Sequence, residues 1–131
     1  MNSSQNEPMA SVQDLQRIVD RVQNGNMCTD ELRVLLHHKS PLIRANALEA
    51  LVCPAQQDIG LLEDLVAAAS DPMNRVTLMG TISVAHVAVA CLFRIGRAEA
   101  VNAARTLLND WRKADRADLD WYLKSEGLNV S

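Results

Sequence analysis

The chain has 131 residues, which is enough for one domain with a hydrophobic core and too few for two ordinary domains. The formal net charge is −3 and there is no dense run of Lys and Arg, so the composition argues against a nucleic-acid-binding protein. Aromatic residues make up 3% of the chain and glycine is scarce, whereas Ala and Leu are frequent, which favours an all-α protein.

The first part of the chain predicts a tail and two helices. Residues 1–9 are polar and are typical of a disordered tail. Apolar residues at three- and four-residue spacing then predict an amphipathic helix over residues 11–23, which an Asn-Gly-Asn turn ends. A short Leu-rich helix that Thr29 can cap follows, and it stops before Ser40.

Ser40 and Pro41 carry the start signal of the next helix. A serine at this place can accept a hydrogen bond from a first-turn amide, and proline suits the first helical position because its missing N–H costs nothing there. Ile43, Ala47 and Leu51 then fall on one side of the helix, which ends near residue 54.

The second half of the chain predicts four further segments. A helix over residues 59–69 is interrupted by Asp71-Pro72, and the sequence does not define the structure of residues 73–80. A long apolar helix begins at Thr81 and stops at Gly96. The last two helical segments cover residues 99–111 and 116–125, with a charged link between them.

The segment SPLIRANALEAL, from Ser40 to Leu51, has a counterpart 41 residues later in TISVAHVAVACL, from Thr81 to Leu92. The cap, the β-branched residue, the small residues and the closing leucine all agree in type. A Leu-rich helix precedes each copy. A period of about 40 residues with two helices per unit is typical of a HEAT-type solenoid.

The stretch LRVLLHHKSPLIRANALEAL resembles a HEAT repeat, with an apolar helix, a turn, Pro, an apolar-Arg pair and A-x-x-A-L. LLEDLVAAASDP and TISVAHVAVACLFRIG together resemble a second repeat of the short bacterial variety, which includes the repeats of phycobilisome lyases. The resemblance covers residues 30–96. It implies that Ser40, Pro41 and Thr81 mark inter-helix turns and that Arg44 is a strut between repeats.

We therefore predict an all-α protein, a short α-solenoid of about six or seven helices in one domain over residues 10–131. Clear repeats are expected at residues 29–54 and 58–96. Because one helical hairpin cannot bury its apolar face alone, the segments 11–23 and 98–125 are expected to cap the stack.

The helix over residues 84–93 is apolar on nearly every side, so it is either buried all round or lies against a partner. The resemblance implies that second helices line a concave face, and an exposed apolar patch there would mark an interaction surface. Aromatic residues near the C-terminus offer a second surface. The expected partner-binding residues are Leu48, Val52, His86, Val89, Phe93, Trp111 and Trp121.

No catalytic, cofactor-binding or metal-binding motif occurs in the sequence, and we expect no cofactor. His37 and His38 are neighbours on a helical segment and point about 100° apart, so they are poorly placed to share a metal. His86 is expected to be a hydrogen-bonded interior histidine. The acidic residues between 110 and 120 alternate with basic ones, which is typical of a solvated surface.

The three cysteines, Cys28, Cys53 and Cys91, have no Cys-x-x-Cys spacing, so neither a disulfide nor a zinc site is predicted and all three are expected to be small buried residues. The longest apolar run is about half of what a bilayer span needs, and no charged-then-apolar leader occurs. We expect a cytoplasmic protein without a membrane partner.

These patterns favour a non-catalytic protein–protein interaction or scaffold module that uses an apolar helical face, with another protein or a second copy as its partner. Two alternatives stay open. An accessory or catalytic lyase-like component would need a polar pocket with an acid or a histidine. A HEAT-like nucleic-acid reader would need a basic concave face, for which Arg44, Arg94 and Arg97 are few.

Overall fold

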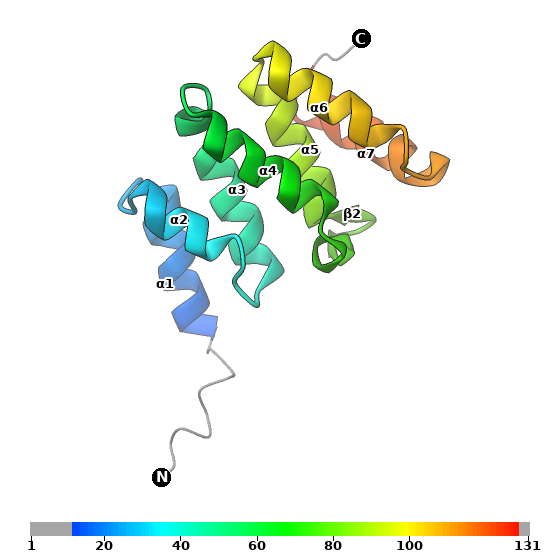
Figure 1. Ribbon diagram of the computed structural model, residues 1–131. Helices are drawn as coiled ribbons and strands as arrows, with labels where there is room; N and C mark the ends of the chain where they lie inside the picture. Colours follow the sequence, from blue (N-terminus) through cyan, green and yellow to red (C-terminus); the bar gives the residue numbers. More distant parts are fainter. Residues whose placement is uncertain (1–11, 129–131) are drawn as a thin grey trace.

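The computed structural model describes residues 12–128 and confirms the all-α class, with seven α-helices in that range (Figure 1). The predicted tail over residues 1–9 lies outside the described residues. The helices are α1 (Val12–Gln23), α2 (Thr29–Leu35), α3 (Pro41–Ala55), α4 (Ile59–Ser70), α5 (Val84–Ile95), α6 (Ala98–Leu108) and α7 (Lys113–Ser125). None of these helices is long and apolar enough to cross a membrane.

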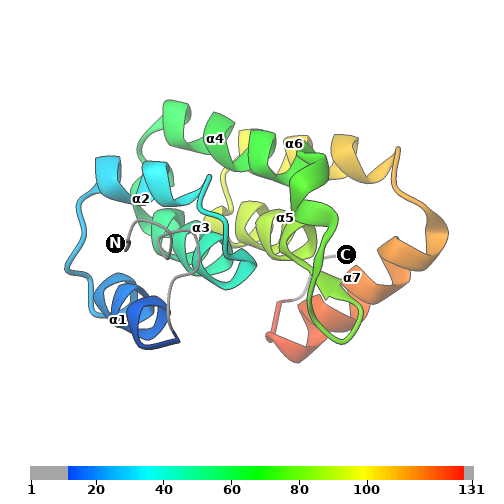
Figure 2. The same cartoon turned by 90° about the horizontal axis from the view of Figure 1, so that it is seen from below.

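The helices form two layers, which Figure 2 shows edge-on. One layer contains α2, α4 and α6, and the other contains α1, α3, α5 and α7. Helices contact their neighbours both across the layers, as α2 with α3 and α4 with α5 do, and within a layer, as α3 does with α5. The chain therefore runs back and forth as a stack of helical hairpins, and α1 covers one end of the stack while α6 and α7 cover the other.

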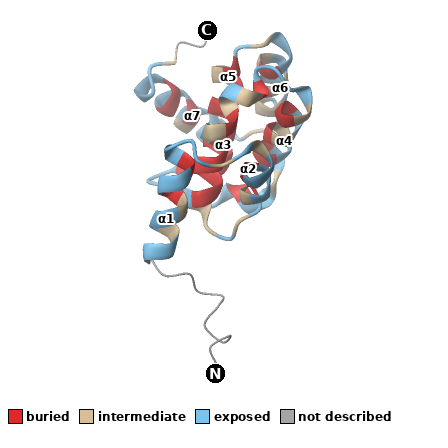
Figure 3. Cartoon of the chain, turned by 90° about the vertical axis from the view of Figure 1, so that its left-hand side faces the viewer, coloured by how far each residue is buried: buried red, intermediate tan, exposed pale blue. Residues whose placement is uncertain are grey.

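Helix α5 lies at the centre of the core. It packs against α3, α4, α6 and α7, and every residue from Val84 to Leu92 is buried. Figure 3 shows the buried residues gathered along α3 and α5, with exposed residues on the outer helices. This surrounding of α5 by four helices explains why its sequence is apolar on nearly every side.

The start of α3 is as the sequence predicts. Ser40 is the N-cap, and its Oγ accepts a hydrogen bond from the Ile43 amide at 3.4 Å, while Pro41 occupies the first helical turn. The cap satisfies one amide that has no partner within the helix.

The segment between α4 and α5 holds a short 3₁₀ helix, η2 (Pro72–Arg75), and a hairpin of β1 (Thr77–Met79) and β2 (Ile82–Ser83). The sequence left residues 73–80 undefined. It also placed the cap of the following helix at Thr81, which is wrong, because Thr81 is exposed in the turn between the strands. Ser83 is the cap, and its Oγ accepts from the His86 amide at 3.2 Å. Residues 82–83 pair with β1 as a strand, and α5 therefore begins after them, at Val84.

Arg44 connects α3 to the segment between α4 and α5 through hydrogen bonds. It is only 2% exposed, and its Nε donates to Oδ1 of Asn74 at 2.7 Å. Its Nη1 donates to the carbonyls of His38 and Lys39 at 2.7 and 3.0 Å, and its Nη2 donates to the Met73 carbonyl at 3.3 Å. Arg44 thereby ties the turn before α3 to η2.

The C-terminal helices differ slightly from their predicted bounds. Gly96 ends α5 in the left-handed conformation with φ of 74°, which glycine adopts without steric cost. Helix α7 begins at Lys113, three residues before the predicted start. Residues 113–115, which include Lys113 and Asp115, form its first turn instead of a link.

Candidate functional site

The predicted apolar binding face on α3 and α5 is not exposed, so that expectation is wrong. Leu48 and Val89 are 0% exposed, because α3 and α5 pack against each other and against α4, and His86 is 3% exposed, because its ring lies against α7 and Trp111. Val52 and Phe93 are half-buried against the same core. These five residues are part of the core or its edge.

The two tryptophans of the expected second surface differ in exposure. Trp111 is half-buried, whereas Trp121 on α7 is 64% exposed. Trp111 contacts the ring of His86 edge-on, with the ring centroids 5.2 Å apart and an interplanar angle of 82°. Trp111 therefore lies against α5, and Trp121 points into solvent.

A cleft of about 420 Å³ with several charged residues in its lining lies where the hairpin meets the start of α7, and we call it the hairpin cleft. One wall comes from η2, the hairpin and the beginning of α5, and the other comes from the turn before α7 and its first two turns. The lining residues are Arg75, Thr77, Gly80, Thr81, Ser83, Ala85, His86, Trp111, Arg112, Ala114, Asp115 and Asp118.

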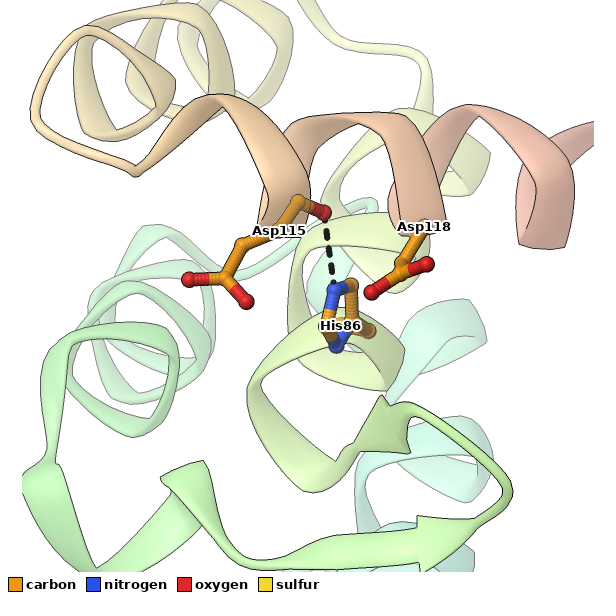
Figure 4. Close-up of side chains that lie close together, drawn as sticks. All are labelled: His86, Asp115 and Asp118. Carbon is orange, nitrogen blue, oxygen red and sulfur yellow. Dashed lines mark hydrogen bonds between the residues drawn. The ribbon is translucent and has the colours of Figure 1, made fainter.

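His86 lies at the base of the hairpin cleft, and both of its ring nitrogens are engaged. Nδ1 accepts from the Ser83 amide at 3.0 Å, and Nε2 lies 2.9 Å from the Asp115 carbonyl oxygen (Figure 4). An amide N–H can only donate and a carbonyl can only accept, so the ring hydrogen is on Nε2. His86 is the interior hydrogen-bonded histidine that the sequence predicts, and it joins α5 to α7.

The charges of the hairpin cleft are only partly paired. Oδ2 of Asp115 lies 3.3 Å from Nε of Arg112, one turn earlier in the chain. Asp118 is half-buried, and neither it nor Arg75 has a hydrogen-bond or ion-pair partner among residues 12–128. Arg75 and Asp118 thus line one cleft from opposite walls without contacting each other.

His86, Asp115 and Asp118 are the one group in the described part of the chain with metal-ligand spacing, since their ligand atoms lie within 4.8 Å of one another. The arrangement does not fit a metal centre. Both nitrogens of His86 are already hydrogen-bonded, and the Asp115 carboxylate pairs with Arg112. Asp118 alone stays available, and one carboxylate is too few to hold a metal ion.

The histidine pair at the end of α2 is not a metal site either. Residues 37 and 38 lie just beyond the end of α2, and His37 is exposed. His38 is half-buried, and its Nδ1 accepts from the Ser40 amide at 2.9 Å. Burial lowers the pKa of His38, and the nearby charge of Arg44 lowers it further.

The three arginines named for a nucleic-acid-reading face are engaged within the protein. Arg44 is buried. Arg94 lies 2.6 Å from the Glu126 carboxylate and 3.8 Å from that of Glu49, and Arg97 pairs with Glu99 at 3.1 Å. These pairs neutralise the basic groups that a phosphate backbone would need.

A smaller cavity and the free cysteines are two further features of the described residues. The cavity of about 190 Å³ between α2 and α4 holds the ion pair of Arg33 and Asp64, whose atoms lie 2.7 Å apart. All three cysteines are free. Cys91 is buried as predicted, but Cys28 and Cys53 are exposed, so their predicted burial is wrong. Neither exposed thiol lies in the hairpin cleft.

The comparisons with known proteins leave the site to be interpreted from its geometry. No family model, no curated protein and no solved structure matches the chain.

Sequence reasoning missed the residues that make the hairpin cleft. Asp115 and Asp118 were assigned to a charge-balanced surface, and Arg75 lay in the undefined stretch. One signal was available, because Asp115, Asp118 and Trp121 recur at three-residue spacing and therefore lie along one side of α7. The opposite wall comes from the hairpin of β1 and β2, which no local sequence pattern predicts.

Proposed function

We propose that this protein is a HEAT-like, non-catalytic protein-binding module and that an extended segment of another protein docks at the hairpin cleft. One observation carries the proposal. Of the seven large hydrophobic side chains that are exposed in the described part of the chain, four belong to the segments that form the walls of this cleft, although none of the four lines the cleft itself. They are Met73, Val76, Met79 and Trp121.

Exposed apolar side chains on the segments that form a cleft with charged groups are typical of a docking surface. Tryptophan is among the residues that contribute most to binding energy when a partner covers it. Burying the exposed part of one indole removes on the order of 100 Å² from water, worth about 2 to 3 kcal/mol before the costs of association. Trp121 is therefore the main expected anchor.

A binding role is favoured over the lyase-like alternative by the state of His86. A catalytic acid or base must reach a proton on its substrate, and both nitrogens of His86 are bonded to the protein. The remaining polar groups of the cleft suit recognition through charge and hydrogen bonds.

The proposal is tested with photo-crosslinking residues placed at position 79 and, as a control, at position 34. Val34 is 71% exposed and lies on α2, away from the cleft. In its own cell, the protein should cross-link reproducibly to one partner protein from position 79, and it should not cross-link to that protein from position 34. The purified partner should then bind the wild type and Val34→Asp equally and bind Trp121→Asp at least tenfold more weakly, as for an anchor residue.

Two results would overturn the proposal. Equal binding by Trp121→Asp and Val34→Asp would place the interface elsewhere. Light scattering that shows a dimer, dissociated by Trp121→Asp and not by Val34→Asp, would make a second copy of the chain the occupant of the cleft.

A further inference from the structure

We propose that the docked segment presents an arginine side chain to Asp118, with the guanidinium held between the carboxylate and the indoles of Trp111 and Trp121. The inference rests on the proposed function, and it names the chemistry that the hairpin cleft recognises.

The Asp118 carboxylate is the part of the cleft that lacks a partner. It is half-buried, and no hydrogen bond or ion pair reaches it from residues 12–128. In Figure 4 it lies on one side of the His86 ring, and the Asp115 carboxylate lies on the other side. An ionised carboxylate can accept up to about four hydrogen bonds, so a donor from outside the molecule has room to bind.

Both tryptophans of the chain belong to the same part of the fold as this carboxylate. Trp111 lines the same cleft, and Trp121 follows Asp118 by three residues on α7, which makes the two side chains neighbours on the helix surface. Aromatic faces attract cations, and tryptophan does so most strongly. A carboxylate that shares its cleft with one indole and has a second indole three residues along the same helix is therefore suited to a cationic side chain.

The geometry favours arginine over lysine. A guanidinium is planar, donates two parallel hydrogen bonds to a carboxylate and stacks on an indole at the same time. An ammonium is a strongly hydrated point charge and cannot do both. The net charge of −3 also favours the approach of a basic segment.

The two basic residues of the cleft indicate which other charge the docked segment of the partner carries. Arg112 is compensated by Asp115 at 3.3 Å, but Arg75 on the opposite wall has no partner among the described residues. A purely basic segment would meet repulsion from Arg75. We therefore expect the arginine of the partner to be accompanied by an acidic residue that reaches Arg75.

The test uses the full chain and short blocked peptides that contain one Glu and either one Arg or one Lys. Binding is followed by NMR at the two indole N–H groups. The Arg peptide should give saturable shifts with a dissociation constant on the order of 1 mM, and the Lys peptide should bind several-fold more weakly.

The variant Asp118→Asn should weaken the Arg peptide by about tenfold or more, since a charge-assisted hydrogen bond is lost. Asp120→Asn is the matched control, because Asp120 is exposed on the same helix, carries the same charge and does not line the cleft. It should leave binding unchanged. Trp121→Phe should retain part of the affinity that Trp121→Ala loses, because phenylalanine keeps an aromatic face.

The inference is overturned if no saturable shift occurs, if Asp118→Asn binds as the wild type does, or if Asp120→Asn weakens binding equally. Its failure can be told apart from failure of the proposed function. A partner that still cross-links from position 79 while the Arg peptide does not bind keeps the docking site and removes the arginine. An Arg peptide that binds at Asp118 while no protein cross-links there keeps the site and removes the protein partner.

Discussion

Arg44 and Asn74 are thirty residues apart in the chain and are joined in the core, with Nε of Arg44 donating to Oδ1 of Asn74 at 2.7 Å. Asn74 is 2% exposed, and its Nδ2 donates to the Ala68 carbonyl at 2.9 Å, so Asn74 connects Arg44 to the end of α4. The guanidinium group thus donates hydrogen bonds to carbonyls of the turn before α3 and to acceptors in η2. It fixes η2, which carries Arg75 into the hairpin cleft.

Replacing Arg44 by Met should lower the free energy of unfolding by about 3 kcal/mol, because the Asn74 side chain and three backbone carbonyls lose their donor in the interior. Urea unfolding followed by circular dichroism measures the loss. Arg75→Met is the matched control, since Arg75 lies next to Asn74 but is exposed, and it should change stability by less than about 0.5 kcal/mol. Equal effects of the two substitutions would contradict the strut role of Arg44.

The cap of α5 gives a second prediction, which separates Ser83 from Thr81. Ser83→Ala should cost about 1 to 2 kcal/mol, because the His86 amide loses its acceptor at the helix start. Thr81→Ala should be nearly neutral, because Thr81 is exposed in the hairpin turn. Thermal or urea unfolding of the two variants decides the matter, and a larger loss in Thr81→Ala would move the helix start back to the residue that sequence spacing favours.

Thr81 and Ser83 show which part of the fold the sequence does not predict. Periodicity and capping predict α3 correctly, because Ser40, Pro41 and the apolar residues that follow act within one helix. The start of α5 depends on pairing between Thr77 and Ser83, which is a contact between two strands. A local pattern offers two capping residues and does not choose between them.

The candidate site is harder to predict for the same reason. Its walls come from residues 75–86 and 111–118, and only the tertiary packing of the hairpin against α7 brings them together. The burial of Val89 likewise depends on how many helices surround α5. Composition indicates that a helix is apolar on all sides, but it does not say whether core or partner covers it.

The three cysteines should react in two distinct classes. Burial raises the pKa of the Cys91 thiol to about 12, and this side chain is 0% exposed, whereas Cys28 and Cys53 are exposed. At pH 8 a thiol of that pKa is ionised to the extent of about one part in ten thousand, so it has almost no reactive thiolate. A disulfide reagent such as DTNB should titrate two thiols of the native protein quickly and the third only in denaturant.

The variant Cys91→Ala assigns the slow class. With DTNB, this variant should release two equivalents of thionitrobenzoate per chain, both in buffer and in denaturant. Three fast equivalents in the native wild type, or a slow thiol that persists in Cys91→Ala, would show that Cys91 is not the protected group.

His38 should make stability depend on pH. The pKa of His38 is lowered from its ordinary value of 6.5, first by burial and then by the positive charges of Arg44 and Lys39. Its Nδ1 also accepts from the Ser40 amide, and that bond is possible only when Nδ1 carries no proton. The unfolded chain therefore binds a proton at this residue more readily than the folded protein does. The stabilising contribution is complete above about pH 6.5 and is lost as the pH falls from there toward the lower pKa of the folded state.

An NMR titration of the His38 ring should give a midpoint below 6.5 in the folded protein. Urea unfolding at several pH values between about 7.5 and 5 should give a steeper fall of the unfolding free energy in the wild type than in His38→Asn. Asparagine is the informative replacement, because its side-chain carbonyl can still accept from the Ser40 amide and does not titrate. A midpoint at or above 6.5, or the same slope in both proteins, would mean that the ring is solvated and that its bond to Ser40 does not hold it neutral.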